Sequence, residues 1–241
     1  MMKTLKLLII LLLLPSLCFG AASRSFDGTN DSIVMGNVLD VTTGNVSVCI
    51  WAKPTESANS EQLIGKKSGV GASLAGYVLQ RESTTDLISM RASDGAQQGQ
   101  SNSTTDIDGT WGFACGTFTA STETTTVAIN AVQEDSDATA NIDSLTNAVN
   151  FQSGEQPNAL NDYTGLLAYG MQFSAVLSIV EMAELMWKPE SIVINTPNGF
   201  WPFWGDSTEI DLSANDNTGT VTGATTSSDG PPVGFGSFLP L

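Results

Sequence analysis

Short runs of strand-forming residues recur along the chain and restrict its fold more than any other feature. The runs are rich in Val, Ile, Thr and aromatic residues and lie between clusters of Gly, Asn, Asp and Ser, which is the pattern of strands joined by turns. Such spacing favours a two-sheet sandwich over alternating strand–helix units. We therefore predict an all-β antiparallel fold with strands near 32–35, 46–53, 62–65, 77–80, 87–91, 113–118, 125–129 and 166–173.

One segment breaks this pattern and predicts a short helix near the C-terminal end. Ser178 and Glu181 have the spacing of a capping box, in which each side chain bonds the other residue's main-chain N–H. Met182 and Leu185 continue an apolar face, and Pro189 ends the segment. We expect this capped helix to cover one end of the sandwich.

The N-terminal segment has the anatomy of a secretory signal peptide. Lys3 and Lys6 precede an unbroken apolar run at 7–14, and small residues follow before position 21. The run is far shorter than the ~20 residues that span a bilayer. We predict a cleaved signal peptide over 1–20 and a secreted or cell-surface protein with no membrane span after cleavage. The alternative is a lipoprotein acylated at Cys18, although the residue before it is larger than such sites normally carry.

The charge balance and the absence of histidine exclude several classes of function. The chain has 9 Lys and Arg against 25 Asp and Glu, a net charge of −16, which becomes −18 when Lys3 and Lys6 leave with the signal peptide. Phosphate binding needs clustered basic residues, so we expect no nucleic-acid partner. The chain has no His, which removes the commonest general base and the commonest zinc ligand.

Two cysteines remain after the predicted cleavage. Cys49 and Cys115 both lie in strand-like segments. In an exported protein such a pair can form a disulfide. The alternative is two buried free thiols that act as small hydrophobic residues. The sequence leaves both open, because a bridge requires the two Cα atoms to lie close together.

The last fifty residues differ in composition from the rest. We divide the mature chain into a domain over 21–190 and a tail over 191–241, in which 200–204 is an aromatic cluster. Exposed aromatic rings can stack on sugar rings, but large aromatic side chains more often pack a segment onto its domain. We therefore predict that the tail, Gly/Pro/Thr-rich after the cluster, packs on the domain, with sugar stacking as the alternative. The candidate ligand-binding residues are Tyr163, Trp201 and Trp204.

Six segments carry a family resemblance when they are read in order. They are Phe26-Asp27-Gly28-Thr29-Asn30-Asp31, Val46 to Pro54, Leu63-Ile64-Gly65-Lys66, Asp108-Gly109-Thr110-Trp111 with 113–118 after it, Thr126 to Asn130, and 165–173 followed by Leu177, Ser178 and Glu181. Together they resemble the laminin-G-like members of the concanavalin A-like lectin/glucanase superfamily. The resemblance implies a jelly-roll sandwich that binds carbohydrate or a protein partner.

The resemblance also raises calcium as an optional cofactor, because some family members bind it. Asp27, Asn30 and Asp31 lie close together and offer the hard oxygen ligands that calcium prefers. The alternative is that these residues only form a turn, since Asn, Asp and Gly favour turns for backbone reasons. No other cofactor is expected.

The sequence contains no recognisable catalytic set. Hydrolases of this superfamily use paired carboxylates, and the nearest candidate, Glu134-Asp135-Ser136-Asp137, lies beside a turn with no Glu after it. The segments at 112–113 and 166–169 lack the His and the paired acidic residues that relatives often carry there. A Ser-His-Asp triad is impossible without His. We therefore predict that the protein is not an enzyme.

These observations favour a secreted, non-catalytic recognition module that binds carbohydrate or a surface partner. An alternative from another class is a structural or adhesive component of a cell surface or viral particle. A glycoside hydrolase is a third reading.

Overall fold

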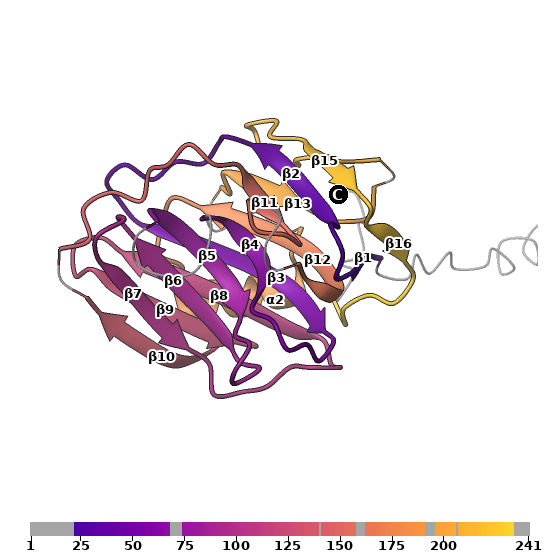
Figure 1. The fold of residues 1–241 in the computed structure, drawn as a ribbon, viewed down its shortest axis with the longest axis horizontal. Helices are drawn as coiled ribbons and strands as arrows, with labels where there is room; N and C mark the ends of the chain where they lie inside the picture. Colours follow the sequence, from indigo (N-terminus) through magenta and orange to yellow (C-terminus); the bar gives the residue numbers. More distant parts are fainter. Residues whose placement is uncertain are drawn as a thin grey trace, which may run out of the picture.

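The computed structural model describes residues 22–67, 74–139, 141–157, 162–190, 196–205 and 207–233. These residues form two antiparallel sheets of eight strands each, with one α-helix outside them (Figure 1). The predicted all-β, jelly-roll-like sandwich with a single late helix is confirmed.

Sheet A has the strand order β10-β9-β8-β3-β12-β1-β16, with β13 paired to β12. Its strands are β1 (Ser23–Asp27), β3 (Val46–Pro54), β8 (Gly112–Thr119), β9 (Thr124–Ile129), β10 (Val132–Ala138), β12 (Thr164–Phe173), β13 (Gly199–Trp201) and β16 (Thr225–Ser227).

Sheet B has the order β14-β15-β2-β11-β4-β5-β6-β7. Its strands are β2 (Ser32–Gly36), β4 (Glu61–Lys67), β5 (Gly76–Arg81), β6 (Ile88–Ser93), β7 (Gln98–Asn102), β11 (Phe151–Ser153), β14 (Thr208–Glu209) and β15 (Gly219–Thr222).

The main core lies between the two sheets. Val48 and Ile50 of β3 face Leu79 of β5 and Met90 of β6, and all four side chains are fully buried. Each such side chain contributes about 1.5–3 kcal/mol of transfer free energy. Because alternate residues of a strand point to opposite faces, this core also fixes which side chains of sheet B point outward.

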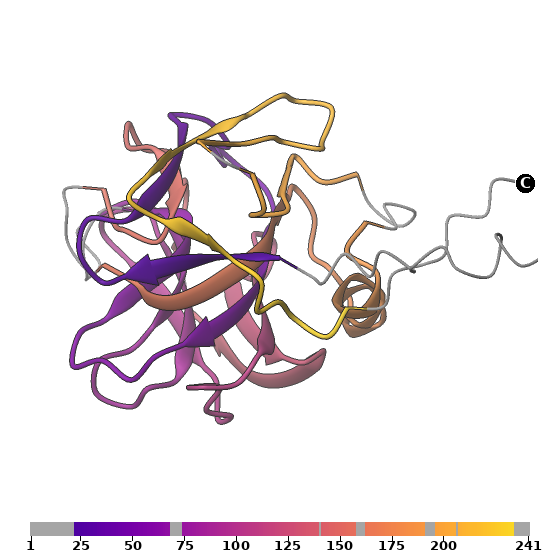
Figure 2. The same cartoon turned by 90° about the vertical axis from the view of Figure 1, so that its right-hand side faces the viewer.

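Helix α2 (Ile179–Trp187) covers the outer face of sheet A rather than an end of the sandwich. The predicted capping box is present: Glu181 N donates to Ser178 Oγ at 3.3 Å, and Ser178 N donates to Glu181 Oε2 at 2.7 Å. Figure 2 shows α2 on the side of the molecule away from β4 and β5. Within the described residues, no helix is long and apolar enough to cross a membrane.

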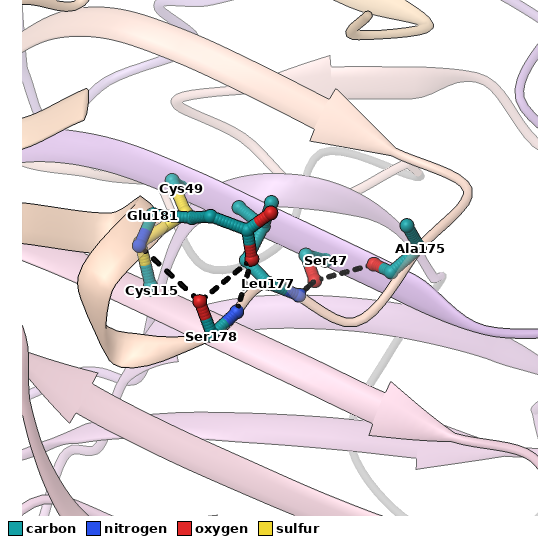
Figure 3. Close-up of a disulfide and its surroundings, with 7 residues drawn as sticks. All are labelled: Ser47, Cys49, Cys115, Ala175, Leu177, Ser178 and Glu181. Carbon is teal, nitrogen blue, oxygen red and sulfur yellow. Dashed lines mark hydrogen bonds between the residues drawn. A yellow bond between two sulfur atoms is a disulfide. The ribbon is translucent and has the colours of Figure 1, made fainter. Parts of the chain in front are cut away.

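A disulfide joins two central strands of sheet A beneath α2. Cys49 of β3 pairs directly with Cys115 of β8, their Cα atoms are 4.2 Å apart, and both residues are buried (Figure 3). Ser47 Oγ donates to Ala175 O at 2.7 Å and accepts from Leu177 N at 3.0 Å, which ties the start of the helix to β3. The structure thus realises the bridge that the sequence left open.

The segment after residue 190 is part of the sandwich rather than an attached tail. Its described residues supply β13 and β16 to sheet A and β14 and β15 to sheet B. Arg24 of β1 donates through Nε to Glu209 of β14 at 2.6 Å, and both side chains are buried. A buried ion pair between the first and the late strands means that this segment belongs to the same folded unit.

Candidate functional site

The three aromatic residues predicted to bind a ligand lie in different environments. Tyr163 and Trp201 are fully buried in the main core, and Trp201 Nε1 donates to Asn217 O at 2.8 Å. These two predictions are wrong, because rings that fill core volume cannot stack on a ligand from solvent. Trp204 is 43% exposed and lies edge-on to Tyr169, with 5.9 Å between the ring centroids. Its role in binding stays a prediction.

The predicted calcium ligands form a turn that their own side chains stabilise. Asp31 Oδ2 accepts from Asp27 N and Asp27 Oδ1 accepts from Thr29 N, both at 2.8 Å, which is typical turn bonding for Asp. Burial raises the pKa of Asp31. Among the described residues, no three His, Cys, Asp or Glu side chains are grouped closely enough to hold a metal. Calcium binding by Asp27, Asn30 and Asp31 therefore stays a prediction.

The acidic run of β10 connects the edges of the two sheets. Its carboxylates accept main-chain N–H groups from β7 and the residues after it: Asn102 to Asp135 at 2.9 Å, Gln100 to Asp137 at 3.2 Å, and Thr104 and Thr105 to Glu134 at 2.6 and 2.8 Å. Burial alone would raise the pKa of Glu134, but hydrogen bonds from Thr105 and Thr104 outweigh it and lower the pKa. A general acid needs the opposite shift, so this run is suited to a structural role.

The Asp-Gly-Thr-Trp motif contributes its first residue, Asp108, to the surroundings of a buried arginine. Asp108 accepts from Arg81 at 2.6 Å and 3.0 Å, and Asp86 accepts from the same guanidinium at 2.6 Å. Glu61 lies 3.8 Å from Arg81. Burial raises the pKa of Glu61 to about 7 against the opposing charge of Arg81. A raised carboxyl pKa can mark an active site, but Glu61 is fully buried, so it holds the fold.

The outward side chains of β4, β5, β6 and β7 are mostly polar. The register places them in three rows across the sheet. The rows are Gln62–Gln80–Ser89–Asn102, Gly65–Val78–Arg91–Gln100 and Lys67–Gly76–Ser93–Gln98. We call the polar members of these rows, together with Glu82 just after β5, the polar face. It is buried at β4, at β5 and at Ser89 and Ser93 of β6, and it becomes half-buried at Arg91 and at β7.

Glu82 holds this face together. Its Oε1 accepts from Gln80 at 3.1 Å, from Ser89, from Arg91 at 2.8 Å and from Gln100 at 3.3 Å. Among the described residues, its Oε2 accepts only from Arg91, at 2.8 Å. Hydrogen bonds between charged partners are about twice as strong as neutral ones, so the Glu82–Arg91 pair orients the side chains around it.

Several buried polar atoms of the face have no hydrogen-bond partner. They are the amide oxygens of Gln62, Gln80 and Gln98 and the Nε of Arg91. A buried polar group left unpaired costs about 1–3 kcal/mol. The four atoms are distributed over the three rows of the face and are themselves closed to solvent, whereas the Glu82 and Arg91 side chains are 11% and 12% exposed. The face therefore presents the Glu82–Arg91 pair to solvent.

Sequence reasoning missed this face because it looked for aromatic rings. The sequence does contain a signal for this face: polar residues stand two apart in three consecutive segments. These segments are Gln80-Arg81-Glu82, Ser89-Met90-Arg91 and 98–102. The last of these was not recognised as a strand at all, since β7 contains no apolar residue.

Comparison with known proteins identifies the family. The family model of the concanavalin A-like lectin/glucanases superfamily matches residues 27–182. The chain therefore belongs to this superfamily, as its segments and its fold indicate. No curated protein sequence matches the chain.

Solved structures share the fold at low sequence identity. A candidate carbohydrate-binding protein from Bacteroides ovatus is 12% identical with a TM-score of 0.67, over 89% of this chain and 61% of that one. The CBM40 of Ruminococcus gnavus IT-sialidase, solved with α2,3-sialyllactose, is 11% identical with a TM-score of 0.56, over 68% and 95%. A heptameric pentraxin from Limulus polyphemus is 11% identical with a TM-score of 0.53, over 70% and 83%. Thus the chain spans less than two thirds of the Bacteroides protein.

Proposed function

We propose that this protein is a non-catalytic recognition module that binds carbohydrate through the polar face of sheet B. The observation that carries the proposal is the Glu82–Arg91 pair, whose side chains are 11% and 12% exposed among the polar side chains of the face. A sugar hydroxyl both donates and accepts hydrogen bonds, so one class of ligand satisfies both members of the pair. The carbohydrate-binding neighbours support the proposal through their shared fold.

The described carboxylates support binding rather than hydrolysis. Glycoside hydrolysis needs two carboxyl groups facing one bond, one of them with a raised pKa. The β10 carboxylates accept main-chain bonds from β7, and Glu61 is buried beside Arg81. Glu82 is the acidic group at the centre of the polar face, and Arg91 is bonded to it.

We place the protein outside the cell or at its surface. The predicted signal peptide over 1–20 lies outside the described residues. The Cys49–Cys115 disulfide supports the proposal, because such bonds persist in oxidising compartments.

A glycan array with the mature chain tests the function. We expect binding to at least one class of saccharide, and we expect Arg91→Ala to abolish it. Lys53→Ala is the matched control, because Lys53 also forms an ion pair, with Asp229 at 2.8 Å, but on sheet A. No binding to any saccharide, or equal loss in both variants, would overturn the proposal.

Metal dependence is tested in the same assay. We propose that binding needs no metal, because the Asp27 and Asp31 side chains already bond the main chain of their turn. Binding should be equal in calcium and in EDTA. A loss in EDTA would instead assign calcium a role, with Asp27, Asn30 and Asp31 as the first ligands to substitute.

A structural or adhesive role is the second candidate, and one surface favours it. Val180 and Trp187 of α2 are 75% and 54% exposed, and residues seven apart lie on one side of a helix. Exposed apolar side chains in one stripe are typical of contact surfaces. Light scattering distinguishes the candidates: a monomer without self-association counts against assembly through α2, whereas oligomers that Trp187→Ser dissociates support it.

A further inference from the structure

The two oxygens of Glu82 differ in how much bonding capacity they have left. Oε1 accepts four hydrogen bonds, from Gln80, Ser89, Arg91 and Gln100. Oε2 accepts one, from Arg91. A carboxylate oxygen has about two lone-pair sites, so Oε1 is saturated and Oε2 can accept one further donor.

Arg91 also has capacity left. Both of its bonds to Glu82 come from Nη2. A guanidinium has five N–H donors. Among the described residues, Nε has no partner but is itself buried, so the donors that remain for a ligand are those of Nη1. The Arg91 and Glu82 side chains are 12% and 11% exposed, so a ligand at the surface can reach both.

We propose that the group recognised at this pair is a vicinal diol, that is, two hydroxyls on neighbouring ring carbons of a saccharide. One hydroxyl donates to Glu82 Oε2, and its neighbour accepts from the guanidinium of Arg91. This inference rests on the proposed function and names the ligand chemistry at the same site. The ion pair holds the acceptor, Glu82 Oε2, and the donor, the Arg91 guanidinium, side by side. This arrangement matches two adjacent hydroxyls, because each hydroxyl can donate or accept a hydrogen bond.

The surroundings disfavour an anionic group at this position. The free acceptor is itself a carboxylate oxygen, and Asp135 and Asp137 of β10 bond the main chain of neighbouring β7. Lys67 of β4 keeps most of its positive charge at pH 7, because burial and the nearby Arg91 lower its pKa only to about 8, but it lies two strands away from β6. A neutral polyol pairs with both members of the Glu82–Arg91 pair, whereas a carboxylate pairs with Arg91 alone.

Periodate oxidation tests the proposal on the unaltered protein, because it cleaves the carbon–carbon bond between vicinal hydroxyls. Each saccharide is printed twice on the array, intact and periodate-oxidised. We expect the saccharides that bind to lose at least tenfold in signal after oxidation. A bound saccharide that has no vicinal diol, or that binds equally after oxidation, would overturn the inference and leave the proposed function in place. The absence of binding to any intact saccharide would instead overturn the proposed function.

Two conservative variants locate the diol on the protein. Glu82→Gln keeps the shape but replaces one oxygen by an amide, and Arg91→Lys keeps the charge but removes the planar donor set. Both should weaken binding at least tenfold while the matched pair Asp229→Asn and Lys53→Gln does not. Folding is checked by the far-ultraviolet circular dichroism spectrum. If folded Glu82→Gln and Arg91→Lys bind as the parent does, the diol does not bind at this pair.

Discussion

Removing the Cys49–Cys115 disulfide should lower stability by an amount that follows from the chain itself. The bridge links residues 66 apart in sequence. In the chain-entropy model, a loop of this length stabilises the folded state by about 4 kcal/mol. For a chain of about 220 residues, each 1 kcal/mol shifts the melting midpoint by about 2–4 °C, so we expect a fall of about 8–16 °C.

The assay compares urea unfolding of three forms of the mature protein. These are the oxidised parent, the parent refolded under reducing conditions, and the double variant Cys49→Ala/Cys115→Ala. The reduced parent keeps both buried sulfur atoms, so it isolates the cross-link from the loss of packing in the double variant. We expect the reduced form to lose about 4 kcal/mol and the double variant somewhat more, because truncating buried groups leaves a cavity. If the reduced form stays within about 1 kcal/mol of the oxidised parent, the chain-entropy reasoning is refuted.

Three further predictions concern buried or bonded carboxyl groups. Glu134→Ala should lower the free energy of unfolding in urea by about 1–2 kcal/mol at pH 7, because hydrogen bonds are lost. Since the folded-state pKa of Glu134 is lowered, this difference from the parent should vanish as the pH falls below the ordinary range of Glu. Glu61 has a raised pKa of about 7, so its favourable contribution to stability is present below about pH 4.5 and is lost as the pH rises through 7. The free energy of unfolding of Glu61→Gln should therefore rise by up to about 3 kcal/mol relative to the parent between these pH values. A pH-independent difference between the two would contradict this. Asp108→Ala leaves Arg81 without its two-point partner and should cost about 3 kcal/mol in thermal unfolding, whereas a cost within about 0.5 kcal/mol would show that Asp86 replaces it.

The fold was largely predictable because strands alternate in polarity and turns have a distinct chemistry. Val46 to Lys53 was predicted as a strand and forms all of β3 except its last residue, Pro54. Asn130 and Ala131, between the strand predicted at 125–129 and β10, have φ of 50° and 59°, the left-handed values of a two-residue hairpin. The capping box predicted the helix start correctly. In each case the deciding interaction is local in sequence.

The missed strands depend on contacts outside their own segments. β7 has no apolar residue and is held by pairing with β6 and by the carboxylates of β10. β15 and β16 are short and pair with β2 and β1, about two hundred residues earlier. Composition marks such segments as loops, because their strand conformation comes from a neighbouring edge rather than from their own residues.

The site was missed for the same physical reason. Trp201 was a candidate because large rings can stack on sugars, but its ring stacks on Phe151 inside the core at 5.4 Å. The polar face becomes visible only when the register places Gln80, Ser89 and Arg91 beside one another. A single strand shows one polar residue in two, which is normal for any half-exposed sheet.

Nuclear magnetic resonance of the mature protein with its best array saccharide locates the binding surface directly. We expect saccharide titration to shift the amide signals of Arg91 and of 98–102, while the indole signals of Trp187 and Trp204 stay unchanged. Shifts confined to those two exposed indoles would instead put binding on the other side of the sandwich, away from the polar face.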